Sequence, residues 1–202
     1  MVTESSTDSE VFRTLLDNKG VKIERKGISV IELGGITSLK YAFYLLRDLE
    51  IPKTIIVDKD FFYDYQNGTK ALSRYASGFF NYRNVFKNEP LINEIFTNVA
   101  ERNQLEGLLT SNHSRALDIT LKYDVVCMKY NLEMDLVASI TAQNLLYNQL
   151  GIPLANRNSN ELLTNNENAL KKIENLTFVI NNLAQKNLPN SYKRLIRRIK
   201  GI

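Results

Sequence analysis

The stretch TIIVDKD, Thr54 to Asp60, indicates how this chain folds. Four residues that suit a buried strand run directly into two acids separated by one lysine. In open α/β sheets, ligands bind at the carboxyl ends of the strands, so Asp58 and Asp60 would lie at a ligand-binding edge. Two carboxylates this close raise each other's pKa unless a cation neutralises them. The segment alone is compatible with a solvated turn or with a cation site.

Strand and helix signals alternate through the first half of the chain. Apolar runs predict strands at residues 2–4, 28–33, 54–57 and 95–99. Thr7-Asp8-Ser9-Glu10 has the form of a capping box and predicts the start of a helix after the first strand. Such alternation predicts a parallel sheet with right-handed crossovers.

The pattern changes beyond about residue 106, where helical spacing dominates. One helix is expected around Met134 to Leu145, and a second from the Thr164–Glu167 cap to Leu183. The last helix carries Leu195, Ile199 and Ile202 on one side. We therefore predict an α/β core at residues 1–110, with an aromatic and basic insertion at about 61–93, and a helical extension at 111–202.

The composition suits one ordinary domain, because 44% of the 202 residues are hydrophobic. No apolar run is long enough to span a membrane, and the N-terminus lacks a signal-peptide pattern. The single cysteine, Cys127, cannot form an internal disulfide, so we expect a cytoplasmic protein. The net charge of +4 is compatible with a polyanion partner. Basic residues gather near the C-terminus: Lys193, Arg194, Arg197, Arg198 and Lys200.

Two further acids favour the cation site over the solvated turn. Glu4 ends the first predicted strand, and Asp8 falls in the first turn of the following helix. If that strand is parallel to TIIV, both acids lie on the same sheet edge as Asp58 and Asp60. Carboxylate oxygens are the ligands that Mg²⁺ and Mn²⁺ prefer. One histidine and one cysteine supply no zinc cluster.

The runs VTESSTD, ISVIELGG and LEIPKTIIVDKD together resemble the Toprim domain of OLD-family (overcoming lysogenization defect) endonucleases. The positions that match this family's pattern are Glu4, Asp8, Gly34, Gly35, Asp58 and Asp60. The family has a further acid in a Leu-Glu pair past its fourth strand, which we assign to Leu105-Glu106. It also has a functional lysine in its helical part, assigned to Lys172 with Lys171 as the rival. Ser5 stands where the family usually has glycine, and Gln104 where it often has a hydroxyl residue.

The resemblance implies a fold and an activity. The expected fold is an α/β Toprim-like parallel sheet flanked by helices, with a helical C-terminal part. The expected reaction is hydrolysis of DNA phosphodiesters with two Mg²⁺ or Mn²⁺ ions, as an endonuclease or nickase in phage defence or DNA processing. The implied metal ligands are Glu4, Asp8, Asp58, Asp60 and Glu106. Glu4, Asp58 and Lys172 would also act in catalysis, with Glu4 taking a proton and Lys172 stabilising charge.

Alternatives remain open at this point. Another Toprim reaction, of topoisomerase or primase type, is one, and a non-catalytic module that binds nucleic acid or an ATPase is another. OLD-family proteins join this domain to an ABC-type ATPase, but Gly68-Thr69-Lys70 lacks the spacing of a phosphate loop, so we expect no nucleotide site here. We therefore expect the chain to be a nuclease half, with the ATPase upstream in the same polypeptide. DNA is the expected substrate, and a homodimer is left open.

Three softer features have ordinary structural readings beside functional ones. His113 could bind phosphate or assist proton transfer, but a surface or capping histidine is more common. Aromatic and basic residues interleave from Phe61 to Phe86, as in single-strand binding surfaces, although packing against the domain is favoured. Phosphate contact and a solvated face are equally compatible with the basic C-terminal helix.

Overall fold

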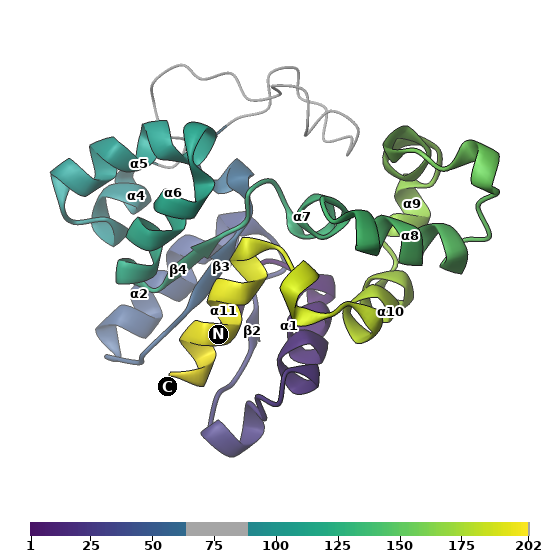
Figure 1. Ribbon diagram of the computed structural model, residues 1–202. Helices are drawn as coiled ribbons and strands as arrows, with labels where there is room; N and C mark the ends of the chain where they lie inside the picture. The colour runs from purple at the N-terminus through teal and green to yellow at the C-terminus, as the bar shows by residue number, and fades with distance from the viewer. Residues whose placement is uncertain (64–88, 202) are drawn as a thin grey trace.

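A four-stranded parallel sheet forms the centre of the protein in a computed structural model, which describes residues 1–63 and 89–201 (Figure 1). The strand order is β2-β1-β3-β4. The strands are β1 (Val2–Thr3), β2 (Ile31–Glu32), β3 (Ile55–Val57) and β4 (Val125–Cys127). Helices flank this sheet, so the predicted α/β fold is confirmed.

The helices alternate with the strands and then dominate the second half. Along the chain they are α1 (Ser6–Asn18), α2 (Leu39–Asp48), α4 (Glu89–Ile95), α5 (Val99–Ser111), α6 (His113–Thr120), α7 (Leu132–Val137), α8 (Ile140–Gln149), α9 (Glu167–Leu170), α10 (Ile173–Asn182) and α11 (Asn190–Lys200). Short 3-10 turns lie at Glu24–Lys26, Ile36–Ser38, Lys59–Phe61, Leu121–Tyr123, Leu154–Asn156 and Gln185–Asn187, and a π-helical turn at Glu161–Asn165. The green helices α8 and α9 project to one side of the sheet in Figure 1.

The prediction of a fourth strand at residues 95–99 is wrong. Ile95 ends α4, and the side chain of Asn98 accepts a hydrogen bond from Glu101 N at 3.1 Å, which begins α5. The fourth strand is Val125–Cys127, paired in register with Ile55–Val57 of β3. The range 111–202, expected to be helical, therefore also contributes a strand to the sheet, whereas the division at residue 110 stays a prediction.

Three predicted helix boundaries also differ from the structure. The cap of α1 is Ser5, not Thr7, because Ser5 and Asp8 exchange the two hydrogen bonds of a capping box. The helix expected from Met134 to Leu145 is split into α7 and α8, with Ser139 at the break. The helix expected from the Thr164–Glu167 cap to Leu183 is split into α9 and α10, since Lys172 has extended backbone with ψ of 134°.

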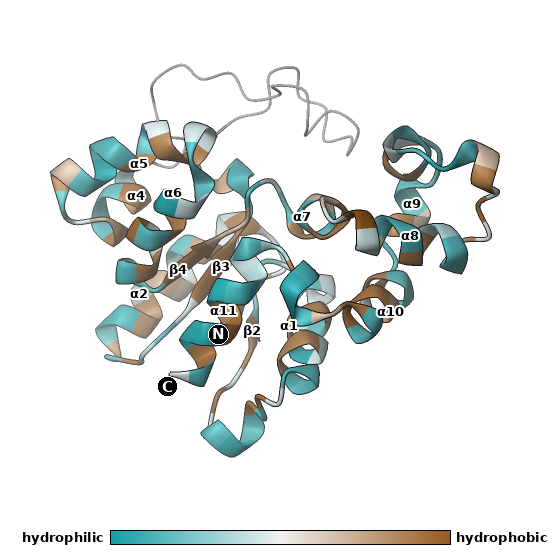
Figure 2. Ribbon diagram, viewed as in Figure 1, coloured by the Kyte–Doolittle hydropathy of each residue, from teal (hydrophilic) through white to brown (hydrophobic). Residues whose placement is uncertain are grey.

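The last helix, α11, joins the sheet to the helical part. Leu195 and Ile199 are buried as predicted, while Ile202 lies outside the described residues. Figure 2 shows apolar colour concentrated on β3, β4 and the inner side of α11. Arg194 pairs with Asp118, Arg198 pairs with Asp124, and Lys193 donates to the Lys186 carbonyl, so three of the five basic residues anchor this helix to neighbouring segments.

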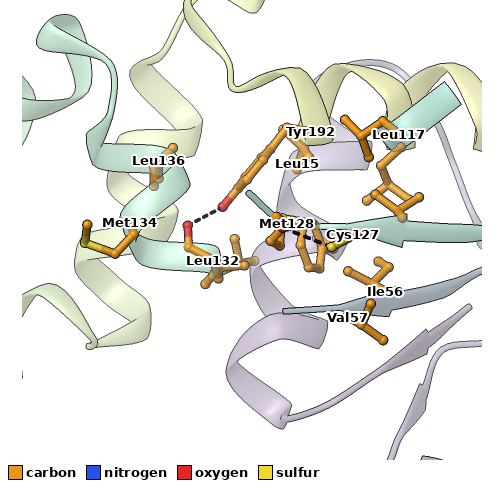
Figure 3. Packing of buried hydrophobic residues seen from close by; sticks show 14 of the residues in the cluster. Leu15, Ile56, Val57, Leu117, Cys127, Met128, Leu132, Met134, Leu136 and Tyr192 are labelled. Carbon is orange, nitrogen blue, oxygen red and sulfur yellow. Dashed lines mark hydrogen bonds between the residues drawn. The ribbon is translucent and has the colours of Figure 1, made fainter. Parts of the chain in front are cut away.

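The core continues from the sheet into α7 and α11, and Cys127 belongs to it. Its side chain is fully buried among apolar residues that include Ile56, Val57 and Met128, so it is a packing residue as expected (Figure 3). Tyr192 of α11 is also fully buried, and its hydroxyl donates to the Leu132 carbonyl at 2.8 Å. This bond ties α11 to the first residue of α7.

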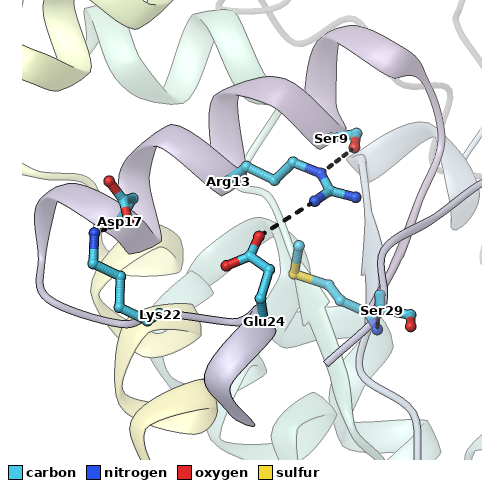
Figure 4. Close-up of polar contacts among 7 residues, drawn as sticks. Ser9, Arg13, Asp17, Lys22, Glu24 and Ser29 are labelled. Carbon is cyan, nitrogen blue, oxygen red and sulfur yellow. Dashed lines mark hydrogen bonds and ion pairs between the residues drawn. The ribbon is translucent and has the colours of Figure 1, made fainter. Parts of the chain in front are cut away.

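Polar contacts hold the outer side of α1 to the loop that follows it (Figure 4). Arg13 donates to Ser9 at 3.3 Å and pairs with Glu24 at 3.8 Å, and Lys22 pairs with Asp17. All the charged side chains in these ion pairs are at least partly exposed, so each ion pair contributes about 0–1 kcal/mol to the stability of the fold. Their main effect is to fix the path from α1 to β2.

Phe61, Phe62 and Tyr63, the first aromatic residues of the predicted insertion, are core residues. All three are buried, and the ring of Phe62 lies 5.9 Å from that of Phe96. The remaining residues of the insertion up to residue 88 lie outside the described residues. Within residues 1–63 and 89–201, none of the helices combines the length and apolar character needed to cross a membrane.

Candidate metal centre

The carboxyl ends of β1 and β3 bring together Glu4, Asp58 and Asp60, which we call the three-acid group. One carboxylate oxygen from each lies within 4.8 Å of the others. Glu4 follows β1 and Asp58 follows β3, and these strands are parallel neighbours. Asp60 is buried in the short 3-10 turn that begins after Asp58. The sequence expectation that these acids share one sheet edge is met.

Two glycines shape the backbone beside Glu4. Gly34 and Gly35 have φ values of 69° and 142°, which L side chains rarely adopt. This turn lets Gly35 N donate to the Glu4 carbonyl at 3.0 Å. The Gly-Gly pair after β2 therefore holds the backbone of the first acid.

Asp8 lies in the first turn of α1 with its carboxylate held by Ser5. Its Oδ2 accepts from Ser5 N at 2.9 Å and from Ser5 Oγ at 2.8 Å. Burial raises the pKa of Asp8, and the bonds from Ser5 partly oppose this rise. Asp8 is also the nearby charge that most raises the pKa of Asp58, so it belongs to the same electrostatic cluster.

Asp58 is the centre of this cluster. Its pKa is raised well above the usual range, first by burial and then by the charges of Asp8, Asp60, Glu133 and Glu4. Like charges crowded at one edge favour protonated carboxyls until a cation binds. The repulsion anticipated from the sequence is thus present in the folded chain.

Glu133 is the acid that sequence reasoning missed. It lies in the first turn of α7, after β4, and its pKa is raised by burial and by Asp8, while Lys171 acts in the opposite direction. The resemblance expects an acid in a Leu-Glu pair past the fourth strand, and with β4 at Val125–Cys127 that pair is Leu132-Glu133. Asn131 then stands two residues before the acid, and its side chain caps α7 by accepting from Met134 N at 2.8 Å. The sequence signal that could have identified Glu133 is the helix-capping residue Asn131, which follows the β-branched run at Val125 and Val126.

Glu106, the acid expected in that place, lies on α5. It is not part of the three-acid group, and one of its carboxylate oxygens is buried without a hydrogen bond among the described residues. Its backbone carbonyl accepts from the Tyr63 hydroxyl at 2.6 Å, which ties α5 to the segment after Asp60. A ligand role for Glu106 stays a prediction.

The two candidate lysines differ in their surroundings. Lys171 pairs with Glu167 at 2.6 Å, and its charge acts on Glu133. Lys172 is exposed at the start of α10. The choice between them stays a prediction, with Lys171 electrostatically connected to the acids.

His113 has an ordinary structural role in this fold. Its Nε2 lies 2.9 Å from the Cys127 carbonyl oxygen. Burial lowers the pKa of His113 to about 4, so the ring is neutral at pH 7. A neutral ring has no positive charge to offer a phosphate.

The donor set fits a hard divalent cation. Mg²⁺ binds oxygens at about 2.1 Å, so two oxygens on one ion are at most about 4.2 Å apart. The oxygens of the three-acid group lie within 4.8 Å of one another, so small side-chain movements suffice. The chemistry and spacing of these residues therefore match a Mg²⁺ or Mn²⁺ site.

A parallel sheet with acids converging at its carboxyl edge has the architecture of a Toprim-like metal-binding domain. The family comparison is more specific. Residues 1–60 match the family described as Overcoming lysogenization defect protein-like, TOPRIM domain, which confirms the resemblance over this segment. Neither a curated protein nor a solved structure matched the chain.

Proposed function

We propose that this chain is a divalent-metal-dependent DNA endonuclease or nickase, the nuclease half of an OLD-family protein. The observation that carries the proposal is the convergence of Glu4, Asp58 and Asp60 at one sheet edge within an OLD-like Toprim segment. Asp8 and Glu133 extend this group, because both act on the pKa of Asp58. DNA as substrate and an upstream ATPase as partner follow from the same family.

The residues would divide the work as follows. Glu4, Asp58, Asp60, Asp8 and Glu133 would hold one or two Mg²⁺ or Mn²⁺ ions, which when bound supply an activated water and neutralise charge on the phosphate. Glu4, a partly exposed member of the three-acid group, would accept a proton from the attacking water. A lysine of the α9–α10 region would stabilise negative charge on the phosphate.

Electrostatics make the cation a condition for binding DNA. The acids of this edge repel phosphate, and burial strengthens the repulsion because the local dielectric is low. Phosphate can therefore approach only after a cation reverses the local charge. The cluster couples metal binding to substrate binding in this way.

Plasmid cleavage tests the proposal directly. Supercoiled plasmid is incubated with the chain and Mg²⁺, Mn²⁺, Ca²⁺ or EDTA, and nicked and linear products are measured. We expect cleavage with Mn²⁺ or Mg²⁺ that is lost in EDTA and in Glu4→Ala and Asp58→Ala. Glu32→Gln is the matched control, because Glu32 is an exposed acid at the end of the neighbouring strand β2. Equal cleavage by wild type and both site variants would overturn the proposal.

One observation favours a second candidate, a metal-binding module that holds nucleic acid without cutting it. Ser5 donates two hydrogen bonds to Asp8 Oδ2, where the family usually has glycine and no hydroxyl. These hydrogen bonds from Ser5 compete with a cation for Oδ2 of Asp8. Ser5→Gly separates the two candidates, since a nuclease limited by this contact gains cleavage, whereas a binding module shows metal-dependent DNA binding and no product in either form.

A further inference from the structure

Asp135 is a buried carboxylate that holds together three segments around the proposed metal centre. It lies on α7, two residues after Glu133, and is 4% exposed. Side chains two residues apart on a helix point to different faces, so Asp135 and Glu133 lie on different faces of α7. Its Oδ2 accepts from Lys129 N at 2.7 Å and from Ser191 Oγ at 3.0 Å, and its Oδ1 accepts from Tyr130 N at 2.9 Å.

The loop that Asp135 holds is bonded to the Asp58–Asp60 segment. Tyr130 O accepts from Lys59 N at 2.8 Å, and Lys59 is the residue between the two acids. Met128 N donates to Val57 O at 2.8 Å, just before Asp58. A shift of this loop would therefore be transmitted to both aspartates.

The third segment is the start of α11. Ser191 donates to Asp135. Its neighbour Tyr192 donates to the Leu132 carbonyl, as Figure 3 shows. These two hydrogen bonds attach α11 to α7 at residues 132 and 135, on either side of Glu133. Since α11 also packs on β4, Glu133 is held at a fixed place relative to the sheet.

We propose that Asp135 is a positioning residue that keeps Glu133 and the Asp58–Asp60 pair in one geometry for metal binding; this rests on the proposed function. A neutral side chain of similar size cannot replace it. An amide offers one acceptor oxygen, and its NH₂ group would face at least one of the three donors. Charge-assisted hydrogen bonds also hold the donors more tightly than neutral ones.

Asp135→Asn is the main test, with metal affinity, cleavage rate and amide exchange as readouts. We expect Mn²⁺ affinity, measured by calorimetry, to fall by about 10–100-fold, as for partners that orient metal ligands. Hydrogen exchange should become faster at the amides of Lys129, Tyr130 and Lys59. The Lys59 amide is the informative probe, because it donates to the carbonyl of Tyr130, whose own amide is held by Asp135.

Ser191→Ala removes one of the three donors and covers the case in which Asp135→Asn fails to fold. It should weaken Mn²⁺ affinity several-fold, and Ser191→Thr, which keeps the hydroxyl, should restore it. Asp118→Asn is the control, because it breaks a different link to α11, the pair with Arg194. Unchanged Mn²⁺ affinity in Asp135→Asn, or in Ser191→Ala where only that variant folds, would overturn the positioning role. Failure of the proposed function appears separately, as a wild-type chain that neither binds Mn²⁺ nor cleaves DNA.

Discussion

Replacing Asp58 with asparagine should stabilise the metal-free protein while greatly reducing the stabilisation that metal binding provides. Asp58 lies in a group whose carboxylate oxygens are within 4.8 Å of one another, with further acids acting on it. Two unit charges at that separation repel by about 3 kcal/mol at an effective dielectric constant near 20. Protonation and solvent relieve part of this repulsion. We therefore expect Asp58→Asn to raise the free energy of unfolding of the metal-free protein by about 1–3 kcal/mol at neutral pH.

The sign of the pH dependence follows from the raised pKa of Asp58. Its unfolded-state pKa is about 3.9, so the folded state binds more protons above that value. The stability of metal-free wild type therefore falls as pH rises above about 4, until the raised pKa is passed. The stability advantage of Asp58→Asn should therefore vanish near pH 4 and increase as the pH rises from there.

Thermal melting in EDTA and in Mn²⁺ is the assay. In EDTA at pH 7.5 the variant should melt roughly 2–12 °C above wild type. Saturating Mn²⁺, at about 1,000 times its dissociation constant, should stabilise wild type by about 4 kcal/mol and the variant far less. Glu32→Gln, which removes the same charge from an exposed site, should change neither value. A variant that melts below wild type in EDTA, or that gains as much from Mn²⁺, would refute the reasoning.

Other consequences follow from the same structure. The pKa values of Asp8 and Glu133 are raised by burial, so Mn²⁺ must displace protons, and its affinity measured by calorimetry should increase from pH 5 to pH 8; a flat profile would contradict this. Lys171→Ala removes the positive charge that acts on Glu133, so it should slow plasmid cleavage more than Lys172→Ala does; the reverse order would support the original sequence assignment. Tyr192→Phe removes the hydroxyl that donates to the buried Leu132 carbonyl and should lower the free energy of unfolding, measured in urea, by about 1–2 kcal/mol with an unchanged m-value. Wild-type stability in that variant would show that the carbonyl finds another donor.

Local patterns were sufficient for much of the fold. The β-branched run before Asp58 and the short run before Glu4 predict two strands of a parallel sheet, and the structure contains both and pairs them directly. The Gly34-Gly35 turn after β2 was also visible, because only glycine readily adopts its φ values. Helix boundaries were less certain, since Ser5 and Thr7 can both cap a helix and packing selects between them.

The sequence by itself determined the strand ends at Glu4 and Asp58, the acid pair at Asp58 and Asp60, and hence the preference for a hard divalent cation. Only the tertiary structure revealed that Glu133 of α7 acts electrostatically on Asp58. The reason is that parallel strands pair over long sequence separations. A short apolar run such as Val125–Cys127 is equally compatible with a strand and with a buried helix, and only its pairing with β3 shows that it is a strand. Two of the three hydrogen bonds on Asp135 are local, from Lys129 N and Tyr130 N, whereas the third needs the tertiary structure, because Ser191 lies 56 residues away in the chain.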